Sequence, residues 1–394
     1  MVAQSLLTLF RRLRQSRGAP RMAALRVAVV GAGSISREFA LQHFGPQTHT
    51  EVACVVDVDE DRAKVLAADV GSIQAGAAVT GDNKYKSKAV RQIGTPVPHF
   101  TGLTGSALDS CDVVYVGTTP ASHLALVSQA LAAGKHVILE KPISASGEDA
   151  DAIVAAVESA LADRGLHTSL NIGMRWNAAL ARMRNELADQ RLGALRGGSL
   201  RLQFQTWPRA WQRQAWCARR AEGGPLREVG THFLFGLHEL FGHGCVRRVM
   251  ASVVFPDGPE GSAAEQSVEG VLELEAGCRG SEGPPVRIQL SVRTTGQLDL
   301  QAAGRDLYEL VVDGELGSLK LFDFTSLEDG DGKTLVSEAA YGRQECVQEL
   351  VAAVRGSEAV GASRMVTARE ARRAQRVLDA ILTSRGSWIS VSYD

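Results

Sequence analysis

Unbroken runs of apolar residues mark the first third of the chain and predict strands that are buried on both faces. The runs occupy residues 27–30, 52–56, 113–116 and 137–139. Between the last two runs, Leu124, Val127 and Leu131 recur at helical spacing and predict a helix with one buried face. Buried strands that alternate with helices predict a parallel sheet, the arrangement of an α/β domain.

Alternating apolar and polar residues mark the second half of the chain and predict strands with one covered face. The alternation is strict in 200–206 and 286–292 and looser in 268–274. Clusters of glycine and proline at 256–261 and 279–285 separate these segments. The pattern is typical of an antiparallel sheet that is covered on one side.

A pair of glycines follows the first buried strand, where a dinucleotide-binding domain turns from strand to helix. Gly31 allows the tight turn, and Gly33 lets a pyrophosphate approach the backbone. Ser34 and Ile35 then begin the helix, whose first N–H groups and positive dipole end favour an anion. Ser36 stands at the third position of the glycine motif, so the motif is incomplete and a plain strand-to-helix connection is the alternative.

The second buried strand ends in an acid that fits the ribose ligand of such a domain. Asp57 lies 24 positions beyond Gly33, near the ~20 expected for the carboxylate that binds the adenosine ribose. Asp59 follows, and no lysine or arginine comes before Arg62, so a 2′-phosphate would meet like charge and NAD is favoured over NADP. The alternative is a solvated acid that caps the helix expected over 60–68.

Further polar residues follow the third and fourth buried strands. They are Thr118, Thr119 and Pro120 after one strand, with His123 close behind, and Glu140, Lys141 and Pro142 after the other. Because parallel strands end at the same edge of a sheet, and ligands bind there, these residues and Asp57 form a predicted cofactor site. Residues 72–100 hold glycines, prolines and a polar patch instead, and we expect a surface insertion there.

Composition and charge limit the classes of protein that remain. The chain has 394 residues, of which 45% are hydrophobic, so two domains with ample core are expected. The net charge of −1 and the 5% aromatic content argue against nucleic acid as a direct partner. No run approaches the ~18 apolar residues of a membrane helix, so no membrane contact is expected. The six cysteines are scattered without a Cys-x-x-Cys pair, and His238 and His243 are one residue too far apart for a zinc motif, so no metal is expected.

The first 25 residues differ from the rest and predict a basic N-terminal extension. Five arginines occur in residues 1–25, and no acidic residue precedes Glu38. Apolar residues recur at helical spacing from Leu6 to Leu13, as in a mitochondrial or plastid transit peptide. The alternative is a disordered extension before a start at Met22, in which case a cytoplasmic protein is expected. Scattered, reduced cysteines suit an intracellular compartment in both cases.

Several motifs together resemble one oxidoreductase family. Beyond the glycine turn they are, in chain order, Thr118-Thr-Pro-Ala-Ser-His123, Ala133-Gly-Lys-His-Val-Ile-Leu-Glu-Lys-Pro142, Asn171-Ile-Gly-Met-Arg-Trp-Asn177, Gly223-Gly-Pro-Leu-Arg-Glu-Val-Gly-Thr-His232 and the helix within 367–384. They are similar to the motifs of the glucose–fructose oxidoreductase, inositol dehydrogenase and rhizopine-catabolism (Gfo/Idh/MocA) family. The resemblance implies a Rossmann domain at 26–145, then an open, mostly antiparallel sheet domain with helices on one face at 146–394. It also implies a homodimer or homotetramer through the second sheet.

The resemblance assigns catalytic roles to residues of an expected cleft between the domains. Lys141 is expected to hydrogen-bond a substrate hydroxyl, and His232 to exchange its proton as the general acid–base. The acid that accompanies this histidine four residues earlier is Glu228 here, in place of the family's aspartate. The family's aspartate three residues after the histidine is replaced by Phe235, which predicts a more apolar substrate pocket.

Two further residues are candidates for the substrate side of the cleft. Arg175 lies in the Arg-aromatic-Asn motif, and Trp211 lies in a run of tryptophans and arginines for which a domain-interface loop is the alternative. The resemblance implies an NAD-dependent oxidoreductase that moves a hydride between the nicotinamide and a secondary alcohol or carbonyl of a sugar, polyol or dihydrodiol. A catalytically silent member that senses dinucleotide is the alternative, because Glu228 and Phe235 depart from the family pattern.

Overall fold

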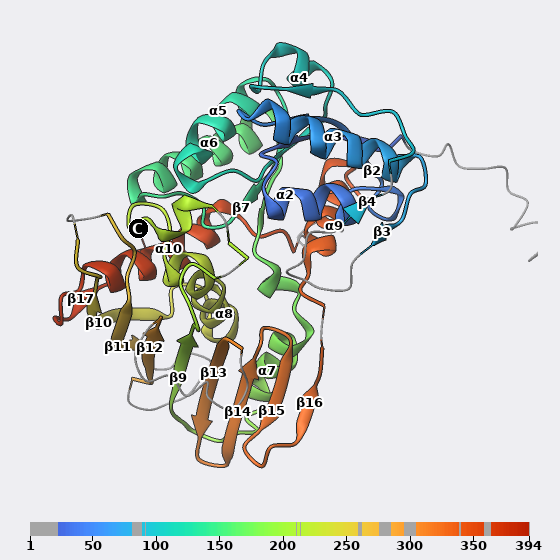
Figure 1. The fold of residues 1–394 in the computed structure, drawn as a ribbon. Coiled ribbons are helices and arrows are strands. Elements are labelled where there is room, and N and C mark those ends of the chain that lie inside the picture. The colour runs from blue at the N-terminus through green and yellow to red at the C-terminus, as the bar shows by residue number, and fades with distance from the viewer. Residues whose placement is uncertain are drawn as a thin grey trace, which may run out of the picture.

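The structure is a computed structural model and contains two β-sheets with the helices around them (Figure 1). It describes residues 23–80, 89–90, 92–209, 211–212, 214–258, 262–275, 285–294, 305–338, 340–357 and 364–393. Within these stretches, no helix is both long and apolar enough to cross a membrane. The expectation of a transit peptide and the polar patch at 82–88 lie outside the described residues.

The first sheet is parallel throughout, which confirms the prediction from the unbroken apolar runs. Over the described residues its strand order is β5–β2–β1–β6–β7–β8. The strands are β1 (Leu25–Val30), β2 (Thr50–Val56), β5 (His99–Phe100), β6 (Val113–Val116), β7 (His136–Glu140) and β8 (Thr168–Asn171). The helical segments between them are α2 (Ser34–Glu38), η1 (Phe39–His43), η2 (Pro46–Thr48), α3 (Glu60–Gln74), α4 (Gly105–Asp109), η3 (Pro120–Ser122), α5 (His123–Ala132) and α6 (Gly147–Arg164). This is an N-terminal Rossmann domain.

The parallel sheet reaches further along the chain than residue 145, where the motifs place a domain boundary. β8 pairs with β7 from Val137–Thr168 to Glu140–Asn171, so α6 and β8 belong to the first domain. At the two ends of the range 72–100, α3 runs to Gln74 and β5 lies at the sheet edge beside β2, so these ends belong to the Rossmann domain, and the surface insertion stays a prediction for the part between them. Between them lies the short pair β3 (Val79–Thr80) and β4 (Ala89–Val90).

The second sheet is antiparallel except for one parallel pair, β9 with β12. Its order over the described residues is β16–β15–β14–β13–β9–β12–β11–β10–β17. The strands are β9 (Leu195–Gln203), β10 (Val246–Val254), β11 (Ser267–Leu274), β12 (Arg287–Arg293), β13 (Leu307–Gly314), β14 (Gly317–Phe322), β15 (Ser326–Asp329), β16 (Thr334–Val336) and β17 (Ile389–Ser390). The expected mostly antiparallel second sheet is therefore confirmed, and its three alternating segments form β9, β11 and β12.

Helices pack on one face of this second sheet, and ion pairs cross the other (Figure 1). The helical segments of this half are η4 (Gly173–Trp176), α7 (Ala178–Ala188), η5 (Ala215–Ala218), η6 (Leu226–Gly230), α8 (Thr231–Phe241), α9 (Arg343–Val354) and α10 (Ala368–Thr383). On the open face, Arg201 pairs with Glu309 at 3.4 Å and Arg293 with Glu269 at 2.9 Å. The homodimer or homotetramer expected through this sheet stays a prediction.

Helix α10 joins the two halves of the molecule. It packs against α8 and β10 of the second half and against α6 of the first. Arg369 and Arg372 of α10 form ion pairs with Glu158 and Asp151 of α6, at 2.6 Å and 2.8 Å. These contacts tie the Rossmann domain to the helices of the second half.

Candidate active site

The glycine turn after β1 has the geometry that a dinucleotide requires. Gly31 has a φ of +93°, and a Cβ there would lie 2.7 Å from the carbonyl oxygen of Gly117, so only glycine fits. Apart from its chain neighbours, no atom in the described part of the chain lies within 4 Å of a Cβ built at Gly33. Packing within the chain therefore does not require glycine at this position. A pyrophosphate that approaches the backbone does require it, so the turn fits the cofactor.

Ser36 takes the place of the third glycine of the motif. Its buried Oγ donates a hydrogen bond to the carbonyl oxygen of Gly117 at 3.0 Å. A Cβ on Gly117 would lie 2.2 Å from that Oγ, so helix and strand remain in close contact. Ser34 and Ile35 begin α2 directly after Gly33, where the first N–H groups of the helix point toward the turn.

Asp57, which follows β2, is held against the glycine turn. Its carboxylate accepts hydrogen bonds from the main-chain N–H groups of Ala32, at 2.6 Å, and Asp59, at 2.9 Å. Arg62 of α3 also donates to it at 3.1 Å, so the first basic residue after the strand folds back onto the acid. The structure thus places Asp57 at the glycine turn. It also places Arg62 beside Asp57, although Arg62 lies five residues further along the chain and its position in the sequence does not predict this contact.

Replacing Asp57 with alanine is expected to weaken NAD binding by about 10-fold to 100-fold, because a charge-assisted hydrogen bond to the ribose is lost. The same change leaves Arg62 paired only with the half-exposed Asp59, at 3.2 Å, so the guanidinium can meet a 2′-phosphate and the affinity for NADP should rise. Fluorescence titration with each dinucleotide measures both constants. The double variant Asp57→Ala/Arg62→Ala should not show the increased affinity for NADP. As a control, Asp61→Ala, which removes an exposed carboxylate nearby, should change the affinity for neither dinucleotide. Unchanged NAD affinity in Asp57→Ala would remove Asp57 from the site.

The segment after β6 packs directly on the glycine turn. A Cβ on Gly31 would lie 3.1 Å from Cγ2 of Thr118. The Ser122 hydroxyl donates to Oγ1 of Thr118 at 2.7 Å and contacts the carbonyl oxygen of Thr119 at 2.9 Å, while Pro120 begins η3. Thr118, Thr119 and Pro120 therefore lie beside Gly31 in a fixed conformation.

His123 supports this segment from behind. It is fully buried, and its ring nitrogens lie 3.2 Å from the carbonyl oxygen of Ile143 and 3.3 Å from that of Thr118. Burial lowers the pKa of the imidazole to about 4, so His123 is neutral at physiological pH. It links the segment after β6 to the segment after β7, and we expect it to shape the cofactor site without touching the cofactor.

Glu140 is buried at the end of β7 and joins three strands. Its Oε1 accepts hydrogen bonds from the Tyr115 hydroxyl at 2.7 Å and from the Asn171 amide at 2.6 Å. Burial raises the pKa of this carboxyl above its ordinary value. Glu140 therefore fixes the sheet edge from which the next residue, Lys141, projects.

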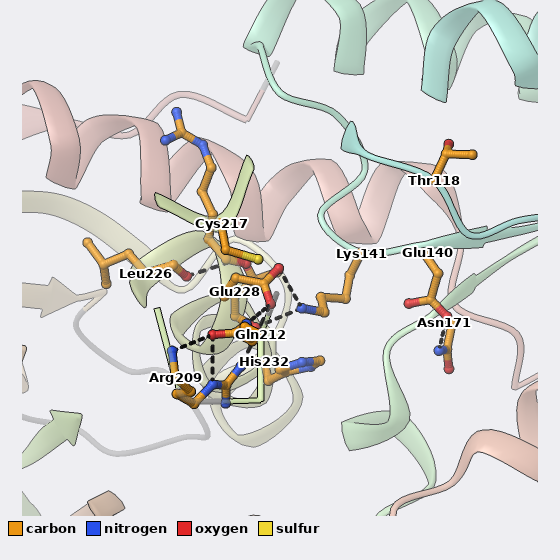
Figure 2. A network of polar contacts seen from close by, with 12 residues as sticks. Thr118, Glu140, Lys141, Asn171, Arg209, Gln212, Cys217, Leu226, Glu228 and His232 are labelled. Carbon is orange, nitrogen blue, oxygen red and sulfur yellow. Dashed lines mark hydrogen bonds and ion pairs between the residues drawn. The ribbon is translucent and has the colours of Figure 1, made fainter. Parts of the chain in front are cut away.

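Lys141 extends from the end of β7 to the second domain (Figure 2). Its ammonium donates to the main-chain oxygen of Glu228 at 2.7 Å and lies 3.5 Å from Oε1 of the same residue. The Lys141 and Glu228 side chains are 15% and 10% exposed, so little water screens their charges. The peptide bond between Lys141 and Pro142 is cis.

A second set of contacts orients the Glu228 carboxylate (Figure 2). Its Oε2 accepts a hydrogen bond from Gln212 at 3.0 Å and lies 3.8 Å from the Arg209 guanidinium. The start of η6 is fixed as well, because Glu265 accepts a hydrogen bond from the Leu226 N–H at 2.8 Å. The longer glutamate side chain is therefore well oriented. Sequence reasoning missed Gln212 as a partner, since it lies in a loop without a motif.

His232 lies four residues beyond Glu228, near the start of α8 and on the same face of the helical segment (Figure 2). The Nδ1 atom of its imidazole is 2.6 Å from the Tyr341 hydroxyl. The ring packs edge-on against Phe324, with centres 5.6 Å apart. No motif marks Tyr341, which lies 109 residues further along the chain, so sequence reasoning missed it.

Trp211 borders this cluster. The Arg209 guanidinium stacks over its indole at 4.5 Å from the ring centre, and the same guanidinium lies near Glu228. Arg209 also donates to the Tyr308 hydroxyl at 3.2 Å, which ties the loop to β13. Arg209 thus links Trp211 to Glu228.

Arg175 belongs to a separate, partly buried ionic cluster. Its guanidinium lies 2.6 Å from Glu370 and 3.2 Å from Glu239, and His243 lies 3.2 Å from both carboxylates. Burial lowers the pKa of His243, but the hydrogen bonds to Glu239 and Glu370 outweigh this effect and raise it to about 8. Phe235 is fully buried beneath Arg175, at 5.6 Å, so both residues serve packing between α8 and α10 instead of an open pocket.

Across the described residues, no group of three or more histidine, cysteine, aspartate or glutamate side chains is arranged to hold a metal ion. His238 and His243 stack on each other with ring centres 5.9 Å apart. His238 accepts a hydrogen bond from the Gly244 N–H at 2.9 Å, and burial lowers its pKa to about 3. These histidines have structural roles.

A glycine turn and a strand-end acid on a parallel sheet, with a strand-end lysine that contacts a glutamate of the second domain four residues before a histidine, are the features of a dinucleotide-dependent oxidoreductase. Residues 25–162 match the family model described as an oxidoreductase family with an NAD-binding Rossmann fold. Residues 25–162 therefore form the NAD-binding Rossmann domain of the Gfo/Idh/MocA oxidoreductase family, and the chain as a whole is similar to proteins of that family.

Relatives and solved structures agree with this assignment. The chain is 27% identical to trans-1,2-dihydrobenzene-1,2-diol dehydrogenase of Bos taurus over 83% of its own length and 89% of that protein. It is 29% identical to 1,5-anhydro-D-fructose reductase of Ensifer adhaerens, but the match covers only 43% of this chain and 42% of the reductase. The fold matches the WlbA dehydrogenase of Bordetella pertussis, solved with NADH and UDP-GlcNAcA, at a TM-score of 0.70 and 17% identity over 94% of this chain and all of that one.

Proposed function

We propose that the chain is an NAD-dependent dehydrogenase acting on a secondary alcohol, or the corresponding carbonyl, of a sugar, polyol or dihydrodiol. The observation that carries the proposal is the contact of Lys141 with Glu228 across the cleft, four residues before His232. A little-exposed lysine that contacts Glu228, and a histidine four residues beyond that glutamate, are the groups that proton transfer from a hydroxyl needs.

Residues of the Rossmann domain are suited to hold NAD. The open space at Gly33 suits the pyrophosphate, and Asp57 is placed for the adenosine ribose. Bound NAD supplies the acceptor for the hydride that leaves the substrate carbon. The release of that hydride requires the hydroxyl proton to leave as well, and this is the task of the protein's own side chains.

Lys141 and His232 divide that task in the proposed mechanism. The Lys141 ammonium donates a hydrogen bond to the substrate oxygen and lowers the free energy of the developing alkoxide. His232 takes the hydroxyl proton at Nε2, the ring nitrogen opposite the one that contacts Tyr341. Glu228 holds the ammonium in place, because its main-chain oxygen and its carboxylate both contact Lys141.

A ring-shaped diol is the substrate class that suits the second domain's side of the cleft. Trp211, with the Arg209 guanidinium stacked on it, offers an aromatic face and hydrogen-bond donors near Glu228. The relatives that are named for a dihydrobenzene diol and an anhydro sugar support the same class.

The test is a spectrophotometric assay of reduced cofactor with a panel of myo-inositol, aldoses and trans-1,2-dihydrobenzene-1,2-diol, together with 1,5-anhydro-D-fructose and NADH in the reverse direction. We expect turnover with at least one ring-shaped diol or ketone and with NAD preferred over NADP. Tight NAD binding without turnover of any compound would contradict the proposal and favour the silent sensor.

A further inference from the structure

A tyrosine of the second domain contacts His232 on the ring nitrogen that the proposed proton transfer does not use. The Tyr341 hydroxyl lies 2.6 Å from Nδ1, well within hydrogen-bond distance. The two rings pack edge-on with centres 5.5 Å apart, and Phe324 packs edge-on against both. Two aromatic rings and the Tyr341 hydroxyl thus lie against the imidazole.

We propose that Tyr341 is a positioning residue for His232, whose phenol oxygen accepts the Nδ1–H of the imidazole and leaves Nε2 to exchange a proton with the substrate. This inference rests on the proposed function, because it takes His232 as the acid–base. Tyr341 itself does not touch the substrate oxygen in this account.

The protons of the step balance with this arrangement. A neutral imidazole that accepts a proton at Nε2 carries its own proton on Nδ1, and that proton needs an acceptor. After Nε2 takes the hydroxyl proton, the ring is an imidazolium, and the same hydrogen bond to Tyr341 becomes charge-assisted and stronger. Burial raises the pKa of the phenol, so Tyr341 remains a neutral acceptor and does not take the proton from the ring. The ring therefore keeps its direction before and after the transfer.

The backbone of Tyr341 is fixed by its neighbours. A Cβ on Gly173 would lie 1.9 Å from the Tyr341 carbonyl oxygen, so η4 packs tightly against this residue. Gly342 has a φ of +83° and lies against Trp176, and Arg343 forms an ion pair with Glu38 of α2. The phenol thus projects from a segment that is anchored in both domains.

Charged groups of several elements lie near the pair. The Arg343 guanidinium lies 5.4 Å from the centre of the Tyr341 ring, the Glu140 carboxyl acts on the phenol through its charge, and Lys141 contacts Glu228, four residues before His232. These groups remain in a Tyr341→Phe variant, so a change in proton affinity on that substitution reports the lost hydrogen bond.

Tyr341→Phe is expected to lower kcat about 10-fold, while KM and the NAD dissociation constant stay within about 2-fold. Without the phenol oxygen, the imidazolium form of His232 loses more hydrogen-bond stabilisation than the neutral form, so the pKa of His232 should fall. The acid limb of the pH profile of kcat should therefore move about 0.5 to 1 pH unit to lower pH. Tyr393→Phe is the matched control, since Tyr393 is a phenol packed edge-on against His238 of the same helix and bonded to the Val246 carbonyl oxygen. It should keep the kcat and pH profile of the wild type.

Two kinetic results would overturn the inference. One is a Tyr341→Phe enzyme with the kcat and pH profile of the wild type. The other is a fall in kcat without a shift of the acid limb, because a merely structural defect gives that result.

A measurement without substrate separates this inference from the proposed function. Nitrogen-15 chemical shifts of labelled histidine, with His232→Asn for assignment, identify the ring nitrogen that carries the proton in neutral His232. We expect the proton on Nδ1 in the wild type and a mixture of tautomers in Tyr341→Phe. A proton on Nε2 in the wild type would overturn the role of Tyr341 even in an active enzyme. A proton on Nδ1 that redistributes in Tyr341→Phe would support the contact even in a protein without turnover.

Discussion

Replacing Lys141 with methionine is expected to lower kcat/KM for alcohol oxidation by about 10²-fold to 10³-fold. Methionine fills a similar volume but cannot donate a hydrogen bond to the substrate oxygen on which negative charge develops. Removing one such donor from a site with little water usually lowers the rate by about this factor. Steady-state kinetics with the best substrate of the panel measures the loss. NAD affinity, measured by fluorescence titration, should stay within about 2-fold, because the ammonium acts on the substrate oxygen.

Lys135→Met is the matched control for this variant. The Lys135 ammonium donates to the main-chain oxygen of Cys111 at 3.0 Å, so it makes the same kind of bond within the Rossmann domain and away from the cleft. The control variant should keep the kcat/KM of the wild type. A Lys141→Met enzyme with unchanged kcat/KM would show that the ammonium takes no part in the chemical step.

Replacing His232 with asparagine is expected to lower kcat/KM by about 10²-fold to 10⁴-fold, the usual contribution of a positioned general base. Asparagine keeps a polar side chain of similar size beside Tyr341 but cannot take a proton. The remaining activity should also lose the acid limb of its pH profile, because the group that titrates there is gone. A pH series of kcat/KM measures both effects.

His238→Asn separates this effect from damage to α8. His238 lies six residues further along the same helix and is buried, and it accepts a hydrogen bond from the Gly244 N–H. Its replacement should therefore lower the melting temperature and leave the pH profile intact. If His232→Asn kept the acid limb of the wild type, another residue would have to be the base.

The parallel sheet could be predicted because its central strands are apolar on both faces. β8 escaped the prediction because Thr168, Ser169 and Asn171 are polar, although all three are buried. Ser169 contacts the Cys346 thiol, and Asn171 bonds Glu140, so partners from distant segments make a polar strand acceptable in the core. Such partners are not visible in the strand's own sequence.

In the candidate site, too, some residues could be predicted from the local sequence, and their partners, which lie far away in the chain, could not. Gly31, Gly33, Asp57 and Lys141 could be chosen from sequence because each lies at a strand end, and strand ends of a parallel sheet meet at one edge. Their partners could not be chosen in this way. Arg62 reaches Asp57 by folding back from α3, and the contact between Tyr341 and His232 depends on how the second domain folds.

The contact between Lys141 and Glu228 spans 87 residues, and that between His232 and Tyr341 spans 109. In a chimaera of two such oxidoreductases, the chain changes from one parent to the other at a junction. A junction that falls between Lys141 and Glu228, or between His232 and Tyr341, would combine contacting side chains from different parents. A junction between Arg62 and β7 keeps all four residues in one parent while Asp57 and Arg62 come from the other. Such a chimaera would exchange the residues of the cofactor turn together, provided that Glu38 and Tyr115 still match their partners Arg343 and Glu140.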